Sequence, residues 1–260
     1  MQTKTVVKHI SDWLYGYAKS SKSKGFIIGI SGGIDSAVTS TIAAHTGLPI
    51  LCVEMPINQN KIEALRAKKH ISWLKKQFDN VKSIESDLTP IFKSFVELHK
   101  GELENKQLAQ ANARARIRMT MLYYHAQTNN SLVVGTGNKV EDFGIGFFTK
   151  YGDGGVDVSP IADLMKSEVF EIGKELNITK AILDAAPTDG LWENNRTDEE
   201  QIGATYKELE WAMTFNGDIN KTSSREKKVI EIYNNFNSAN KHKMLPIPIC
   251  EIPKSLKQKL

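Results

Sequence analysis

The sequence has few cysteines, no long apolar run and no strong excess of either charge. Its two cysteines, Cys52 and Cys250, lie far apart and form no CxxC pair, which excludes a disulfide framework and a cysteine zinc site. We therefore expect a reducing, cytoplasmic compartment. No apolar stretch approaches the ~20 residues that a membrane-spanning helix needs, which excludes an integral membrane protein. The N-terminal residues have the pattern of an amphipathic helix and not of a signal peptide.

Charge and composition are those of an ordinary globular protein. The net charge is +4, which is too mild to indicate nucleic-acid binding by itself. Hydrophobic residues make up 40% of the chain and charged residues 25%, which argues against global disorder. Since domains average roughly 150 residues, we expect one large domain. We expect no nucleic-acid partner and no membrane partner.

Hydrophobic periodicity predicts strands that alternate with helices. Short apolar runs predict strands at 25–30, 48–55, 81–85 and 131–135. Helical spacing predicts helices at 5–20, 35–45, 60–77, 88–99, 103–127, from Asp198 to about 215, and 224–236. The tail after the last helix is expected to be extended. This order predicts a single α/β domain over residues 1–260, with a doubly wound, Rossmann-like parallel sheet and helices on both faces.

A glycine-rich segment after the first strand carries the strongest chemical signal. Residues 29–36 read GISGGIDS and lie between a buried strand and a helix. Backbone N–H groups and a helix N-terminus converge at such a turn and bind phosphate, and glycine lets the backbone approach a ligand closely. Asp35 among phosphates requires a cation, and Mg²⁺ suits a carboxylate beside phosphate oxygens. The segment is neither a Walker loop nor a dinucleotide fingerprint.

The string SGGIDS resembles the pyrophosphate loop of the N-type ATP pyrophosphatases. Three later segments, GTGNKVE at 135–141, GFFTKYGDGGVD at 146–157 and APTDGLW at 186–192, closely resemble NAD synthetases. The match extends over essentially the whole chain. The resemblance implies a C–N ligase that amidates deamido-NAD with ammonia. ATP is consumed, an adenylated intermediate forms, and the products of this final step of NAD biosynthesis are NAD, AMP and diphosphate.

The resemblance also implies roles for residues at matching positions. ATP would be bound by Gly29, Ile30, Ser31, Gly32, Gly33, Ile34, Asp35, Ser36, Thr136, Lys166 and Thr188. Deamido-NAD would be bound by Arg116, Lys150, Asp157, His242 and Lys243. Asp35 and Glu141 would hold Mg²⁺, and Asp35, Lys166 and Asp153 would be catalytic.

Two departures leave alternatives open. Asp142 follows Glu141, and one extra residue separates Glu141 from the GFFTK segment, so either carboxylate can be the second metal ligand; we favour Glu141. Arg114 and Arg118 flank Arg116 on the same helix and are weaker candidates for substrate binding. The segment at 144–157 is predicted to be a loop that can act as a lid, and 185–200 a second polar loop.

The resemblance further implies a homodimer with deamido-NAD bound across the subunit interface. Only 28 residues precede Gly29, so we expect no N-terminal glutaminase domain and use of free ammonia. One alternative is a tRNA-modifying ligase of the same superfamily, which would be expected to show zinc-type cysteines, a catalytic cysteine or an RNA-binding domain. Another is a nucleotide-sensing protein without turnover, which would not need the full set of Asp35, Glu141 and Lys166.

Overall fold

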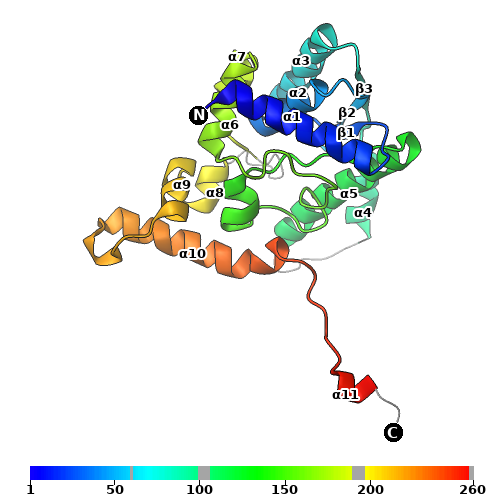
Figure 1. Ribbon diagram of the computed structural model, residues 1–260. Helices are drawn as coiled ribbons and strands as arrows, with labels where there is room; N and C mark the ends of the chain where they lie inside the picture. Colours follow the sequence, from blue (N-terminus) through cyan, green and yellow to red (C-terminus); the bar gives the residue numbers. More distant parts are fainter. Residues whose placement is uncertain (59–60, 99–105, 189–196, 258–260) are drawn as a thin grey trace.

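A parallel four-stranded sheet in the order β3-β2-β1-β4 lies between two layers of helices. Figure 1 shows β1, β2 and β3 beside α1. The computed structural model describes residues 1–58, 61–98, 106–188 and 197–257. The strands are β1 (Phe26–Gly29), β2 (Ile50–Glu54), β3 (Val81–Glu85) and β4 (Leu132–Val133). Phe26 pairs with Ile50 on one side and with Leu132 on the other. This topology confirms the predicted fold class.

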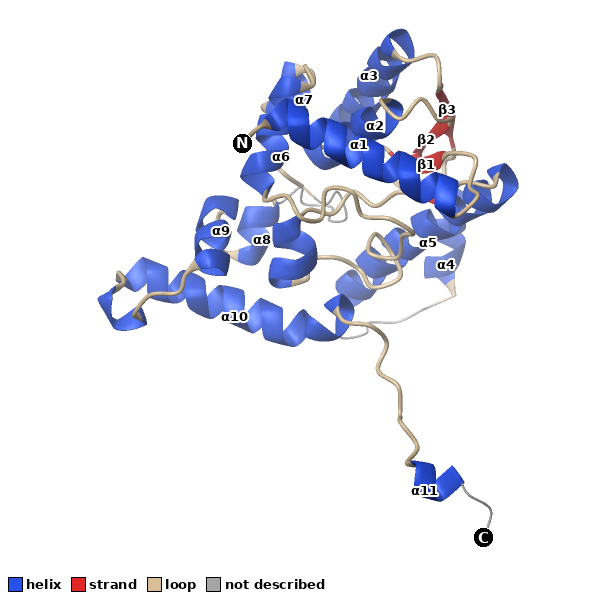
Figure 2. Ribbon diagram, viewed as in Figure 1, coloured by secondary structure: helices blue, strands red, loops and turns tan. Residues whose placement is uncertain are grey.

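Helices cover both faces of the sheet (Figure 2). One face is covered by α1 (Thr3–Ser20), α2 (Ile34–Ala44), α3 (Lys61–Gln77), α6 (Lys166–Glu175) and α7 (Lys180–Leu183). The other face is covered by α4 (Thr89–Glu97) and α5 (Lys106–Asn129). Successive side chains of a strand point to opposite faces, so Phe26 and Ile28 enter the first core and Ile27 enters the second. Burial on both faces explains why this strand is continuously apolar.

A third hydrophobic cluster lies beside the sheet and supports the C-terminal helices. Its elements are the π-helical turn η1 (Val140–Ile145), α8 (Asp198–Ile202), α9 (Tyr206–Thr214) and α10 (Ser224–Met244). A 3₁₀ turn, η2 (Ile219–Lys221), precedes α10, and a short helix, α11 (Lys254–Lys257), follows it. No helix in the described ranges has the length and apolar character that crossing a membrane requires.

The prediction of one helix from Asp198 to about 215 is wrong. Gly203 has a φ of +84° and ends α8, because a residue in the left-handed region terminates an α-helix. Thr205 then starts α9 with a capping box, in which its side chain accepts the Glu208 N–H and the Glu208 carboxylate accepts the Thr205 N–H.

The last helix extends beyond its predicted end at residue 236. Because the sequence from 224 to 244 contains no glycine or proline, α10 continues to Met244. His242 and Lys243 therefore lie in the last turn of a helix and not in an extended tail.

Candidate active site

The phosphate loop joins β1 to the N-terminus of α2. Gly32 has a φ of +87° and packs on α3, where a Cβ would lie 2.6 Å from the Glu63 carbonyl oxygen. Gly33 is the N-cap of α2, and its N–H donates to Ser31 Oγ at 3.2 Å. The buried Ser36 hydroxyl donates to the Gly33 carbonyl at 3.1 Å. Gly32 and Ser36 thus shape the loop and do not line the adjacent cavity.

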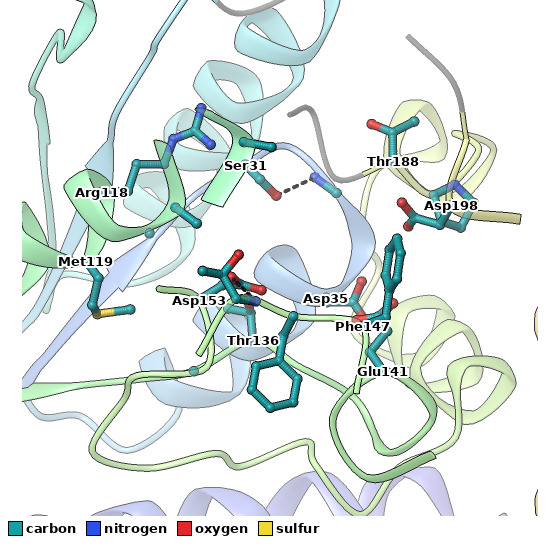
Figure 3. Close-up of a pocket in the computed structure, with 18 of the residues that line it drawn as sticks. Ser31, Asp35, Arg118, Met119, Thr136, Glu141, Phe147, Asp153, Thr188 and Asp198 are labelled. Atoms are coloured by element: carbon teal, nitrogen blue, oxygen red, sulfur yellow. Dashed lines mark hydrogen bonds between the residues drawn. The ribbon is translucent and has the colours of Figure 1, made fainter. Parts of the chain in front are cut away.

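The loop borders a cavity of about 630 Å³ at the carboxyl end of the sheet (Figure 3). Ligands bind at this end of parallel α/β sheets. The predicted site residues that line the cavity are Gly29, Ile30, Ser31, Gly33, Ile34, Asp35, Thr136, Glu141, Asp153, Lys166, Thr188 and Lys243. The fold therefore gathers into one cavity residues that are widely separated in the sequence.

Lys166 joins the two predicted metal-binding carboxylates. Its buried ammonium donates to Asp35 Oδ2 at 2.7 Å and to Glu141 Oε1 at 2.9 Å. The buried Asn138 amide donates to Asp35 Oδ1 at 3.0 Å and accepts the Glu141 N–H at 3.2 Å. Buried charges are tolerated when they are paired and hydrogen-bonded in this way.

The cluster shifts the protonation equilibria of its members. Burial raises the pKa of Asp35, although the Lys166 charge opposes it. Burial also acts to raise the pKa of Glu141, but the Lys166 charge and the hydrogen bonds from Tyr206 and Lys166 hold it below its ordinary value. For Lys166 the two carboxylates outweigh burial and raise the pKa, so the ammonium stays charged.

Glu141 and Asp142 lie in different surroundings. Glu141 lines the cavity, whereas the Asp142 carboxylate packs against Gly137, where a Cβ would lie 2.2 Å from Asp142 Oδ1. Burial and the Glu141 charge raise the pKa of Asp142 to about 8. This arrangement favours Glu141 as the carboxylate that faces a ligand.

Basic residues predicted for deamido-NAD gather beside the cavity. Arg116 Nε donates to the Lys150 carbonyl at 3.2 Å, and Lys150 Nζ donates to the His242 carbonyl at 2.8 Å. These three residues do not line the cavity, and the Arg116 and His242 side chains are exposed. Lys243 does line it, with Nζ donating to the Phe148 carbonyl at 2.7 Å, and burial lowers the pKa of Lys243.

Asp157 ties the glycine-rich segment to the sheet. Its Oδ2 accepts the Val133 N–H at 2.8 Å and its Oδ1 accepts the Tyr123 hydroxyl at 3.0 Å. Asp157 does not line the cavity. Thr188 does line the cavity, and its hydroxyl donates to Glu63 Oε1 at 2.9 Å.

The predicted loop at 144–157 begins within η1 and continues as turns. Asp153 Oδ1 accepts the Thr149 N–H at 3.0 Å, and the Thr149 hydroxyl donates to Asn112 on α5 at 2.7 Å. The second predicted loop, 185–200, is described only at 185–188 and 197–200, and its last three residues begin α8. Trp192 and the rest of 189–196 lie outside the described residues.

Sequence reasoning missed several residues of the site. Asn138 could have been found, because it lies inside the GTGNKVE segment. Arg118 was considered only as a weaker candidate, yet it lines the cavity, with Nε donating to the Met55 carbonyl at 3.1 Å. Tyr206, whose hydroxyl donates to Glu141, lies in no recognisable motif, so no local signal points to it.

Known proteins resemble this chain over nearly its whole length. Residues 6–246 match a family model described as NAD synthase. An NH3-dependent NAD+ synthetase of Mycoplasma genitalium is 40% identical over 228 residues, which are 87% of this chain and 88% of that protein. The structure of an NMN synthetase from Francisella tularensis has a TM-score of 0.86 and 33% identity, over 97% of this chain and 100% of that one. An NH3-dependent NAD synthetase from Campylobacter jejuni has a TM-score of 0.78 and 26% identity, over 96% and 100%.

Proposed function

The chain belongs to the NAD synthase family, and from this premise we propose how its cavity carries out the ATP-dependent amidation of deamido-NAD with ammonia. This ligase reaction is the last step of NAD biosynthesis. The observation that carries the assignment to this cavity is that the phosphate loop, Lys166, Asp35 and Glu141 meet there, beside a group of basic residues.

The reaction has two parts. A carboxylate oxygen of the nicotinate first attacks the α-phosphorus of ATP, the bond from that phosphorus to the bridging oxygen breaks, and diphosphate leaves. Ammonia then attacks the activated carbonyl carbon, the bond to AMP breaks, and the nitrogen loses protons to leave the amide. Both parts require that anionic substrates are oriented and that charge on the leaving diphosphate is neutralised.

The phosphate loop and Lys166 supply most of the groups that orient ATP and neutralise the charge on the leaving diphosphate. The N-terminus of α2 at Gly33 and the loop residues that line the cavity give backbone N–H groups and partial positive charge to the ATP phosphates. Asp35 and Glu141 keep the Lys166 ammonium charged, and that ammonium stabilises the negative charge that develops on diphosphate. Thr136 and Thr188 line the same cavity and add hydroxyl groups toward the nucleotide.

Asp35 and Glu141 fit a magnesium ion. Mg²⁺ takes oxygen ligands, commonly one or two carboxylates together with phosphate oxygens and water. Two carboxylates around one ammonium leave a net negative charge, which attracts a cation. Asp35 and Glu141 would supply two of its oxygen ligands, and the ATP phosphates and water would supply the others. When bound, the ion would neutralise charge on the diphosphate.

We assign deamido-NAD to the basic group beside the cavity. Arg116, Lys150 and His242 are joined by hydrogen bonds, and Lys243 extends from the same turn of α10 into the cavity. Positive side chains at this place suit the diphosphate of a dinucleotide. Asp157 holds the glycine-rich segment to β4, which supports an indirect contribution to substrate binding. Asp153 faces the cavity and is proposed to act in catalysis.

We also propose a homodimer in which deamido-NAD lies at the subunit interface. Exposure of Arg116 and His242 supports this, because a second copy can cover a substrate held at the edge of the cavity. Sedimentation velocity at micromolar concentration should show a dimer, and a fully active monomer would contradict the proposal. A cytoplasmic location stays a prediction from the sequence.

The direct test supplies purified protein with ATP, deamido-NAD, ammonium and Mg²⁺ and measures NAD and AMP together. We expect equal amounts of both, and Lys166→Met should abolish both. Nucleotide binding without NAD formation would support a sensing protein and refute the assignment.

A second candidate is the formation of NMN from the corresponding mononucleotide. The similarity to an NMN synthetase over nearly the whole chain favours testing it. Deamido-NAD and nicotinic acid mononucleotide present the same nicotinate carboxylate to ATP. The assay above, run with each of them in turn, therefore compares the two substrates. We expect a higher kcat/KM for deamido-NAD, and the opposite ratio would identify the mononucleotide as the substrate.

A further inference from the structure

The buried hydroxyl of Tyr206 lies between two carboxylates. Tyr206 begins α9, and its Oη lies 2.5 Å from Glu141 Oε1 and 3.1 Å from Asp198 Oδ2. Its ring also faces Lys166, whose Nζ lies 4.7 Å from the ring centroid. One side chain therefore contacts both residues to which the proposed function gives metal and phosphate chemistry.

A phenol has a single proton to donate, so only one of the two carboxylates can accept it at a time. The shorter distance places this proton in the hydrogen bond to Glu141. Because Glu141 Oε1 also accepts from Lys166, the oxygen is held from two sides. Asp198, buried at the start of α8, is within reach as a second acceptor for the same proton.

We propose that Tyr206 is a positioning residue for Glu141, whose Oε1 it holds in place by its hydrogen bond while the carboxylate meets a metal ion. This inference rests on the proposed function, in which Glu141 is a magnesium ligand. Glu141 Oε1 accepts from both Tyr206 and Lys166, so loss of the Tyr206 hydroxyl would hold the carboxylate less firmly in the orientation that meets a cation. The ring of Tyr206 contacts the Lys166 ammonium through a separate cation–π interaction.

Tyr206→Phe isolates the role of the hydroxyl, because it keeps the ring that faces Lys166. Mn²⁺ binding to the enzyme with α,β-methylene ATP can be followed by the electron paramagnetic resonance signal of free Mn²⁺. We expect Tyr206→Phe to weaken Mn²⁺ binding and to lower kcat, each by about tenfold or more, as for a lost hydrogen bond to a charged group. The KM for deamido-NAD should stay within about twofold.

Two further variants make the result specific. Glu141→Gln should weaken Mn²⁺ binding at least as much as Tyr206→Phe. Tyr233→Phe is the matched control, because Tyr233 is a partly buried tyrosine on α10 that packs on the same hydrophobic cluster; it should change neither quantity.

The outcomes separate this inference from the proposed function. Unchanged Mn²⁺ affinity in Tyr206→Phe together with a loss in Glu141→Gln overturns the positioning role alone. Unchanged affinity in both variants overturns the metal assignment and the inference with it. A lower thermal midpoint in Tyr206→Phe with wild-type Mn²⁺ affinity indicates a purely structural tyrosine and also overturns the inference.

Discussion

Acid should destabilise this protein through one buried histidine. The His70 ring is fully buried on α3, with Nε2 2.9 Å from Ser40 Oγ and the ring stacked on Trp73. Its Nδ1 has no hydrogen-bond partner within the described part of the chain. Protonation would place an N–H without an acceptor in the core, and burial lowers the pKa of His70 from 6.5 to about 4.

The sign of the effect follows from proton uptake. Between pH 6.5 and about 4, the unfolded chain binds a proton at His70 that the folded chain does not, so the free energy of unfolding decreases as the pH falls through this window. At about 1.4 kcal/mol per unit of pKa difference, the loss at pH 4 is about 3 kcal/mol. Well above pH 6.5 the histidine is neutral in both states and contributes no pH dependence.

Urea unfolding at a series of pH values between 7.5 and 4 measures this loss. His70→Gln removes the titrating group, so its free energy of unfolding should decrease by about 3 kcal/mol less than that of the wild type across the window. His9→Gln, at an exposed position on α1, should follow the wild type and serves as the control. Equal losses in the wild type and His70→Gln would refute the reasoning.

Three further predictions concern the cavity, and a fourth concerns the nitrogen source. Asp35→Asn should leave folding intact and lower kcat about 100-fold or more, because it removes a charge beside the phosphates, and near-normal turnover at limiting Mg²⁺ would contradict this. Glu141→Gln should raise the Mg²⁺ concentration for half-maximal turnover more than Asp142→Asn does, and the reverse order would assign the ligand to Asp142. Arg118 lines the cavity together with the phosphate loop, so Arg118→Ala should weaken ATP binding about tenfold by calorimetry. Arg116→Ala should mainly raise the KM for deamido-NAD, and exchanged effects would contradict both expectations. The purified protein should make NAD from ammonium and little from glutamine, so stoichiometric release of glutamate would overturn the expected nitrogen source.

The sequence by itself determined the chain order of the four strands and of the helices as far as α5, and the place of the phosphate loop. These features depend on neighbouring residues: a continuous apolar run makes a buried strand, and glycines follow it where the backbone must turn toward a ligand. The sequence did not predict α6 and α7, which also cover the sheet. The predicted strand at 81–85 agrees with β3, and the helix predicted at 60–77 agrees with α3 within one residue. The motifs resembling NAD synthetases also identified the family, because they are contiguous strings.

Only the tertiary structure decided how the charged residues meet. Lys166 bridges Asp35 and Glu141, and Tyr206 reaches Glu141 across 65 positions of sequence. Helical spacing could not show that Arg118 would line the cavity while Arg116 would not. Such contacts depend on how the helices pack around the carboxyl end of the sheet, and on the burial that packing produces. Local sequence patterns do not predict this packing or this burial, because both arise from contacts between residues far apart in the chain.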